Sequence, residues 1–272
     1  MKPYVVLEKS VGETPLSCVE AYRANHPELA EVPMAYAGRL DPMASGKLLV
    51  LLDDECKVQE KYHALDKEYE FEILFGVASD TQDVLGMVHK KGASMIDPGL
   101  LAQTVRGFKG MIELPYPLFS SKTVRGKPLH TWKLEGKDHE IAIPTKHSRI
   151  YSLEVIDTRI VSAASVYEYA AKKIETIPKV TDERKAIGND FRRTDVRASW
   201  RDFQEAHKDA QETPYTVAKI RCICSSGTYM RSLCEAIAEK LSTSGLAFSI
   251  HRTKIGAYTA LPLGFSFWRR TF

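Results

Sequence analysis

The sequence has few cysteines and no long hydrophobic run. Its five cysteines are an odd number, and none stands in a CxxC pair or at zinc-finger distance from a histidine. This pattern argues against both a disulfide framework and a metal site. The longest apolar run, residues 48–52, has the length of a strand and is far too short to span a membrane. Charge precedes any apolar segment at the N-terminus, unlike in a secretory signal peptide, and we expect a cytoplasmic protein.

The common catalytic templates are missing as well. The chain contains no GxGxxG, no P-loop, no GxSxG elbow and no HExxH motif. Its eight histidines are scattered, so the sequence indicates neither a metal cluster nor a Ser–His–Asp arrangement. These absences exclude the most familiar nucleotide-binding, serine-hydrolase and zinc-protease patterns.

What is present is the composition of a globular protein. With 272 residues, 44% hydrophobic and 27% charged, the chain can bury a core without disulfides, and its length favours one domain with an insertion. The net charge of +3 is unevenly spread, because residues 215–272 carry eight Lys and Arg against two Glu, whereas residues 1–60 carry six against ten acidic residues. Converging basic segments suit a polyanion such as nucleic acid, although charge alone favours an ordinary solvated surface.

Local patterns predict an α+β protein with a mixed sheet. Strict alternation over residues 67–76 predicts a half-buried strand, and Asp97-Pro98 and Thr14-Pro15 each predict the start of a helix. Residues 164–212, rich in Ala and in charged side chains, predict a mostly helical, exposed insertion. Irregular alternation of strands and helices favours a mixed sheet over a doubly wound parallel one. Further strands are expected at residues 4–7, 48–52, 152–161 and 215–224, with a final strand around 251–258, and further helices at 128–135 and 228–241.

One carboxylate stands in a loop shaped by glycine. Asp41-Pro42 lies between Gly38 and Gly46, with Arg39 close by. Glycine permits close approach of the backbone and proline restricts it, so such a loop can present the carboxylate into a cleft. Taken alone, an ordinary turn built on Asp-Pro is the better interpretation of the same residues.

A second candidate is Arg231, in the first turn of the helix predicted at residues 228–241, with Thr228 as its N-cap. A cation near the positive end of a helix is unfavourable unless an anion compensates, and either a carboxylate or a phosphate would serve. The alternative is a solvent-facing arginine paired with Glu235 four residues on.

Five motifs, in order, resemble those of the TruB-type tRNA pseudouridine synthases. Each motif alone is weak, but their shared order along the chain makes the resemblance specific. The matches are residues 38–46 to G-x-LDP-x-A-x-G, residues 67–71 and 75–86 to a K-x-Y strand and a GxxSDTxDxxG loop, residues 114–127 to P-x-YSA-x-K-x-x-GK, residues 224–231 to CS-x-GTY-x-R, and residues 250–253 to L-R-R-T.

The resemblance implies a fold and an activity. The fold would be the pseudouridine synthase fold, a curved, largely antiparallel mixed sheet flanked by helices, with a central cleft crossed by RNA. The activity would be isomerisation of uridine to pseudouridine, at the T-loop uridine (position 55) of tRNA, with no cofactor and no metal. The partner would be the T-arm of tRNA, and the enzyme would be a monomer without membrane association. Two alternatives stay open: the same chemistry on another structured RNA, and a non-catalytic RNA-binding or RNA-folding protein.

The resemblance also implies roles for single residues. Asp41 would be the nucleophile at C1′ or the base at C2′, and Arg231 its charged partner. Tyr69 would stack on the flipped base, near the C5 proton that is lost. The implied substrate-binding residues are Tyr229 and Ile250 at the uracil pocket, Tyr36 stacking on the RNA loop, Lys122 and Arg39.

A small-molecule hydrolase built on Asp41 is a further alternative. It would need a second carboxylate for acid–base chemistry, and Asp80 and Asp83 are the local candidates. For both we expect a role in capping their own loop.

The chain differs from the usual organisation of the family in two respects, its expected C-terminal end and the segment at residues 164–212. We expect residues 1–272 to form a single catalytic domain without the C-terminal PUA-like RNA-binding domain that is usual in the family. Some of the contacts to RNA phosphates that such a domain makes must then come from another part of the chain, and we expect the insertion at 164–212 to supply them. Deleting residues 168–210 should then raise the Kd for RNA and leave the fold intact.

Overall fold

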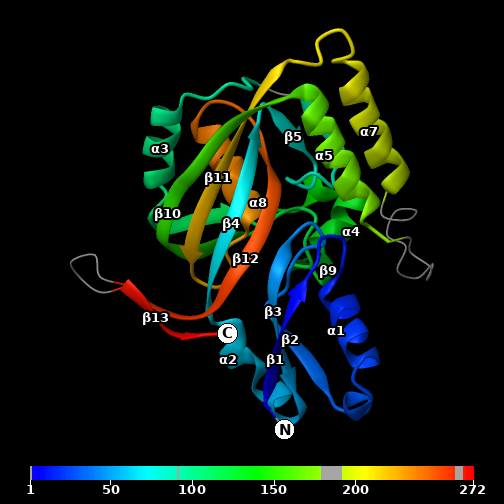
Figure 1. The fold of residues 1–272 in the computed structure, drawn as a ribbon, viewed down its shortest axis with the longest axis vertical. Helices are drawn as coiled ribbons and strands as arrows, with labels where there is room; N and C mark the ends of the chain where they lie inside the picture. Colours follow the sequence, from blue (N-terminus) through cyan, green and yellow to red (C-terminus); the bar gives the residue numbers. More distant parts are fainter. Residues whose placement is uncertain (1, 91, 179–191, 261–265) are drawn as a thin grey trace.

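A nine-stranded mixed sheet forms the centre of the molecule (Figure 1). The computed structural model describes residues 2–90, 92–178, 192–260 and 266–272. Among the described strands of this sheet all pairings are antiparallel except that of β12 with β3. The main path runs through β1 (Tyr4–Lys9), β3 (Ser45–Leu52), β12 (Gly245–Ala260), β4 (Asp66–Phe75), β11 (Pro214–Cys224), β10 (Thr145–Ser162) and β7 (Gly110–Pro115), with β2 (Met34–Ala37) on β3 and β13 (Ser266–Thr271) on β12.

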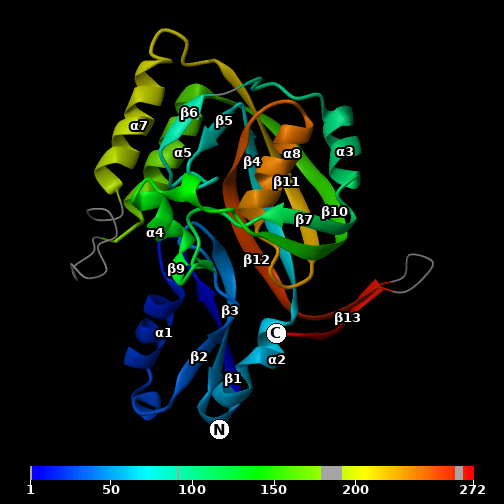
Figure 2. The same ribbon diagram turned by 180° about the vertical axis from the view of Figure 1, so that it is seen from behind.

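Helices and short elements cover the sheet. Helix α8 (Met230–Lys240) packs against its inner face, and α3 (Pro98–Arg106) lies beside β10 (Figure 2). The predicted Asp97 cap is confirmed, because its side chain accepts from the backbone N–H of Leu100. The remaining elements are α1 (Pro15–Ala24), α2 (Gln59–His63), α4 (Leu129–Leu134), α5 (Ala163–Glu175), α7 (Arg193–Glu205), β5 (Val77–Ser79), β6 (Val88–Lys90), β8 (Thr123–Val124), β9 (Lys127–Pro128), and the 3-10 turns at Pro27–Leu29, Asp53–Val58 and Asp138–Glu140.

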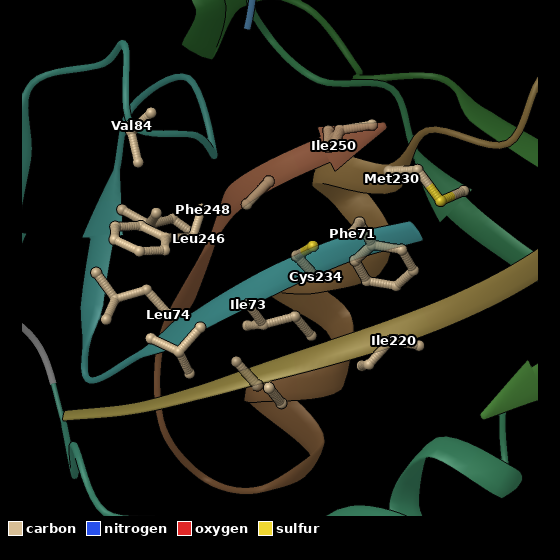
Figure 3. Packing of buried hydrophobic residues seen from close by; sticks show 14 of the residues in the cluster. Phe71, Ile73, Leu74, Val84, Ile220, Met230, Cys234, Leu246, Phe248 and Ile250 are labelled. Carbon is tan, nitrogen blue, oxygen red and sulfur yellow. The ribbon is translucent and has the colours of Figure 1, made fainter. Parts of the chain in front are cut away.

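The main core lies between the inner face of the sheet and α8. Figure 3 shows Phe71 and Ile73 of β4 in one cluster with Cys234 of α8. Cys222 and Cys224 of β11 are fully buried in this cluster, where their thiols serve as small core side chains. Since α8 begins at one end of this core, its first turn is held firmly against the sheet.

The N-terminal elements pack on their own smaller cores. Strands β1, β2 and β3 form one corner of the sheet, and α1 covers them at the bottom of Figure 1. The predicted Thr14 cap is confirmed, since its hydroxyl accepts from the N–H of Ser17 and the Ser17 hydroxyl accepts in return from the N–H of Thr14. This corner holds the chain that leads into the loop at residues 38–46.

Three strand predictions need correction. Strand β4 is more buried than the predicted half, because it lies between β11 and β12 and even Lys67 and Glu68 are covered. The strand expected at 152–161 is the C-terminal part of the longer β10, which pairs with both β7 and β11. The strand around 251–258 is not the last one, since β13 follows it and pairs with its end.

In its described residues, the segment expected to be an exposed insertion is mostly helical, but each of its two helices buries one face. Helices α5 and α7 pack on each other and on the main core (Figures 1 and 2). Residues 179–191 lie outside the described part of the chain. A deletion of 168–210 would strip apolar side chains from the core, so the expectation that it leaves the fold intact is wrong. The buried apolar side chains of the two helices that lie within 168–210 are Ala170, Ile174, Val196, Trp200 and Phe203.

The helices also bear on membrane association. In the part of the chain that the structure describes, no helix combines the length and the apolar character needed to cross a bilayer. Helix α7 buries one face against the protein and exposes polar side chains on the other, with Trp200 buried and Arg201 exposed.

Candidate active site

A cleft of about 1100 Å³ opens between the sheet, the N-terminal corner and the α5–α7 pair. The loop at residues 38–46, the β4 end that carries Tyr69 and the start of α8 line one side of it. The ends of α5 and α7 line another side, through Ile174 and Val196. Among the predicted site residues, those that line the cleft are Tyr36, Arg39, Asp41, Tyr69, Tyr229, Arg231 and Ile250.

The loop that carries Asp41 is held rigidly from behind by Arg252. This arginine is fully buried, and its guanidinium donates to the backbone carbonyls of Gly38, Arg39 and Lys47 at 2.8–3.3 Å. Gly46 has φ +107°, and a Cβ there would lie 2.4 Å from the Arg252 carbonyl oxygen, so only glycine fits. The Asp41-Pro42 segment is both an ordinary turn and a loop that presents a carboxylate. The backbone carbonyl of Asp41 accepts from the N–H of Ala44 to close the turn, and its side chain lines the cleft.

Arg231 is the direct partner of Asp41. Its Nε donates to Asp41 Oδ2 at 2.8 Å, and only 3% of the arginine is exposed. The alternative of a solvent-facing arginine paired with Glu235 is therefore wrong, and Glu235 instead accepts from the side chain of Gln82. The anion predicted to compensate a cation in this first helical turn is a carboxylate of the protein itself.

The cap predicted for α8 differs from the one observed. Tyr229 holds the N-cap position, and its side chain makes no capping hydrogen bond. The hydroxyl of Thr228 points back and donates to the carbonyl of Ser225 at 2.9 Å. The helix begins two residues later than predicted because Thr228 is used in the turn before it.

Asp83 is a site residue whose contact with Arg231 the sequence pattern did not reveal. Its Oδ2 lies 3.7 Å from Arg231 Nε, while Oδ1 accepts from Thr81 Oγ1 and the N–H of Leu85. Burial raises the pKa of Asp83, and the charge of Arg231 opposes that rise. Although burial alone would lower it, the pKa of Arg231 is raised by the charges of Asp41 and Asp83. The arginine is thus held charged between two carboxylates, one facing the cleft and one buried.

The loop-capping role predicted for Asp80 and Asp83 is confirmed. Asp80 Oδ1 accepts from the N–H of Met87 at 2.9 Å, and Asp83 caps Leu85 in the same loop. A hydrolase would need one of them free to transfer protons to substrate. Asp83 is committed to its loop and to Arg231, and Asp80 to its loop and to Arg192, so the geometry does not favour that alternative.

The floor and walls near Asp41 suit a flat, uncharged ring. Tyr69 on β4 and Ile250 on β12 come from paired strands, and Tyr229 packs edge-on against Tyr116 with 5.4 Å between ring centroids. Burial raises the pKa of Tyr69 to about 12, so its hydroxyl is protonated near neutral pH. Burial likewise raises the pKa of Tyr229. The pocket thus offers neutral aromatic and aliphatic surfaces beside one carboxylate.

Two of the predicted substrate-binding residues lie at the edge of this arrangement. Arg39 is exposed, and its Nη1 donates to Ser121 Oγ at 2.9 Å. Lys122 is also exposed and lies outside the residues that line the cleft, with its Nζ 5.3 Å from the Tyr116 ring centroid. The roles of both stay predictions.

One buried lysine at the cleft was not predicted as a site residue. Lys67 Nζ donates to the carbonyl of His63 at 3.0 Å and to Ser226 Oγ at 3.3 Å. Burial lowers its pKa to about 8. It ties the start of β4 to the turn that precedes α8, and the K-x-Y pattern was the only signal in the sequence that marked it.

Comparison with models of known protein families identifies the family of this chain. The model of the TruB family pseudouridylate synthase N-terminal domain matches residues 29–173. The chain belongs to this family. The matched residues include the loop of Asp41, strand β4 with Tyr69, and Asp83, so one part of the cleft lies inside the family match and the part with Arg231 lies outside it.

Named relatives agree with the family. The tRNA pseudouridine synthase B of Caldicellulosiruptor saccharolyticus is 28% identical over 258 residues, which are 95% of this chain and 69% of that protein. The same enzyme of Syntrophus aciditrophicus is 25% identical over 95% of this chain and 64% of its own length. The chain therefore spans about two thirds of the length of these relatives.

Solved structures confirm the predicted fold. A chain in the crystal structure of a Cbf5–Nop10–Gar1 complex matches with a TM-score of 0.53 over 93% of this chain and 48% of its own. Its sequence identity is 17%, so this likeness concerns the fold alone. The α+β pseudouridine synthase fold, with a mixed and mostly antiparallel sheet flanked by helices, is the fold of this protein.

Proposed function

We propose that the protein isomerises uridine to pseudouridine in RNA, and that its substrate is the T-loop uridine (position 55) of tRNA. The observation that carries the proposal is the Asp41–Arg231 pair, a half-exposed carboxylate held by a buried arginine on the wall of a cleft. A protein that only binds RNA gains nothing from a carboxylate there, because phosphate repels it. Relatives named tRNA pseudouridine synthase support tRNA as the substrate.

The chemistry requires the target base to leave its stack and enter the cleft. The C1′–N1 bond breaks, the uracil rotates, its C5 bonds to C1′, the C5 proton is lost, and N1 takes up a proton, so that the overall change is an isomerisation. Asp41 either attacks C1′, forming a sugar ester, or removes a proton from C2′, forming a glycal, and either route needs its carboxylate ionised. Arg231, kept charged by two carboxylates, holds the Asp41 carboxylate in place through a charge-assisted hydrogen bond.

The neutral walls of the pocket serve the uracil. Tyr69 would stack on the flipped ring, and its protonated hydroxyl would relay the C5 proton by accepting it while passing its own proton to water. Tyr229 and Ile250 would hold the detached ring while it rotates, since they contribute flat and apolar surface without a fixed hydrogen-bond pattern. Tyr36, Arg39 and Lys122 would contact the RNA around the target.

The same proposal extends to the setting of the enzyme. We infer that residues 1–272 act as one catalytic unit and that the protein works as a monomer in the cytoplasm. Its five cysteines are free thiols, four of them buried, as suits a reducing compartment. The exposed side chains of Lys172 on α5 and Arg201 on α7 would add to the phosphate contacts, which gives the helical segment an RNA-facing role without separating it from the core.

Tritium release from a [5-³H]uridine-labelled tRNA transcript tests the proposal. The wild-type protein should release tritium, and Asp41→Asn should slow release by at least roughly 10²- to 10⁴-fold, because the nucleophile or base is lost in a side chain of nearly the same shape. A transcript with the T-loop uridine replaced should release none from that site.

The controls separate the alternatives. Arg39→Met, a change at the cleft edge, should alter KM more than kcat, and circular dichroism should show Asp41→Asn folded. If neither protein releases tritium while both still bind the transcript, the isomerase proposal fails and an RNA-folding role takes its place. Release from another labelled RNA alone would move the proposal to that substrate.

A further inference from the structure

The helical segment reaches the catalytic wall through one side chain, that of Arg192. This residue directly precedes α7 and lies outside all five matched motifs. Its guanidinium pairs with the carboxylate of Asp80, with Nη2 3.4 Å from Oδ1, and lies over the ring of Phe119 with Cζ 4.2 Å from the centroid. Arg192 thus bridges the loop that follows β5 and the loop that follows β7.

The same two loops hold Arg231. Its Nη1 donates to the carbonyl of Thr81 at 2.9 Å, and its Nη2 donates to the carbonyl of Phe119 at 3.2 Å. Thr81 follows Asp80 directly, and Phe119 is the very residue on which Arg192 stacks. Arg192 therefore contacts both loops that supply the backbone acceptors of Arg231. In one loop it stacks on the accepting residue, Phe119, and in the other it pairs with Asp80, next to the acceptor Thr81.

We propose that Arg192 is a positioning residue for the reaction: it fixes the Asp80–Thr81 and Phe119 loops so that Arg231 faces Asp41. This inference rests on the proposed function. It gives the α5–α7 segment a share in catalysis that the matched motifs do not record, and it predicts that a change over 100 residues away in sequence from Asp80 alters the rate of chemistry.

The backbone that carries Arg192 is held in place by the packing of α7. Helix α7 is anchored to the same region as Asp80, because Trp200 Nε1 donates to the carbonyl of Val84 at 3.1 Å and Ser199 Oγ accepts from the N–H of Val88 at 3.1 Å. Arg192 itself has φ 56°, a left-handed conformation that costs free energy in a residue other than glycine. The packing of α7 holds it there.

A direct grip on an RNA phosphate is the rival role for this arginine. The side chain of Arg192 is 14% exposed and that of its partner Asp80 17%, so its charge is covered and already matched by a carboxylate. A phosphate contact would require this ion pair to break. The geometry therefore favours a fixed brace over a free cation at the cleft mouth.

Steady-state kinetics of four variants tests the proposal. Arg192→Met should lower kcat by about tenfold or more with KM changed less than about twofold, since a small misplacement of Arg231 slows the chemical step without removing a contact to RNA. Arg192→Lys should recover part of the loss, because it keeps the charge but not the planar stack on Phe119. Asp80→Asn should lower kcat similarly. In the double variant with Arg192→Met, the loss of kcat should be smaller than the product of the two single losses, because both changes break the same ion pair.

Arg197→Met is the matched control. Arg197 lies in the same helix and also pairs with a carboxylate, that of Glu175, away from the cleft. It should leave kcat and KM unchanged, and the Tm of every variant should be measured beside its rates. If Arg192→Met does not fold, Asp80→Asn, which keeps the acceptor for the N–H of Met87, decides the question alone.

The outcomes are distinct. A wild-type protein that makes no pseudouridine overturns the proposed function and leaves Arg192 without a reaction to position. An active wild type with unchanged kcat in Arg192→Met and Asp80→Asn overturns the positioning role. A rise in KM with kcat unchanged would assign Arg192 to RNA binding and overturn it as well.

Discussion

At the scale of single residues, the cleft is organised around one arginine and two carboxylates. Arg231 lies between Asp41, which faces the cleft, and Asp83, which is buried. A buried arginine without these partners would be strongly unfavourable, so each member of the group depends on the others. The family motifs contain all three residues, but their motif positions say nothing about which of them touch.

Tyr69 allows a test of stacking against proton transfer. Tyr69→Phe keeps the aromatic ring and removes the hydroxyl, so kcat should fall about 10²-fold or more while KM stays close to that of wild type. Tyr69→Leu removes the ring as well, so KM should also rise, because stacking on the base is lost. Rates of pseudouridine formation over a range of tRNA concentrations separate the two parameters, and equal effects of both variants on KM would contradict the assignment.

At the scale of elements, the α5–α7 pair is part of the core. Trp200→Ala should reduce the free energy of unfolding by about 3–5 kcal/mol, because a fully buried ring and its hydrogen bond to Val84 are both lost. Urea unfolding followed by circular dichroism measures the loss. Trp132→Ala is the matched control, since that indole also donates to a carbonyl, that of Val124, but is only partly buried. Equal losses in the two variants would show that α7 adds little to the core.

The elements were predicted well where one pattern decides them. The Thr14 and Asp97 caps, strand β4 and helix α4 follow from capping residues and alternation that act within a few residues. The start of α8 was missed because Thr228 bonds to the turn before it. The exposure of α5 and α7 was misjudged because a charged composition hides the narrow apolar stripe that faces the core.

At the scale of the whole molecule, buried charge links stability to pH. Burial lowers the pKa of Lys67 to about 8, against 10.5 for an exposed lysine, so between these values the unfolded chain binds a proton that the folded protein does not. The contribution of Lys67 to the free energy of unfolding should therefore rise with pH across this window, by at most about 3 kcal/mol.

Comparison with Lys67→Met isolates this contribution. The difference in unfolding free energy, wild type minus variant, should increase from pH 7 to pH 10 in urea titrations. Lys61→Met, at an exposed lysine in α2, should show no such change in the difference. A difference that stays flat, or falls as the pH rises, would mean that Lys67 is not held in a charge-disfavouring site.

The family, the fold class and most of the predicted residues that line the cleft follow from the sequence alone, because the order and spacing of the motifs are written in the chain. The contacts between these residues became clear only from the tertiary structure. It shows that Asp41 compensates the charge of Arg231, that Asp83 lies beside Arg231 as a second carboxylate, and that Arg192 pairs with Asp80. The reason is physical. Capping and alternation act between near neighbours, whereas these contacts join residues more than 100 positions apart, and only the packing of the whole sheet and its helices brings them together.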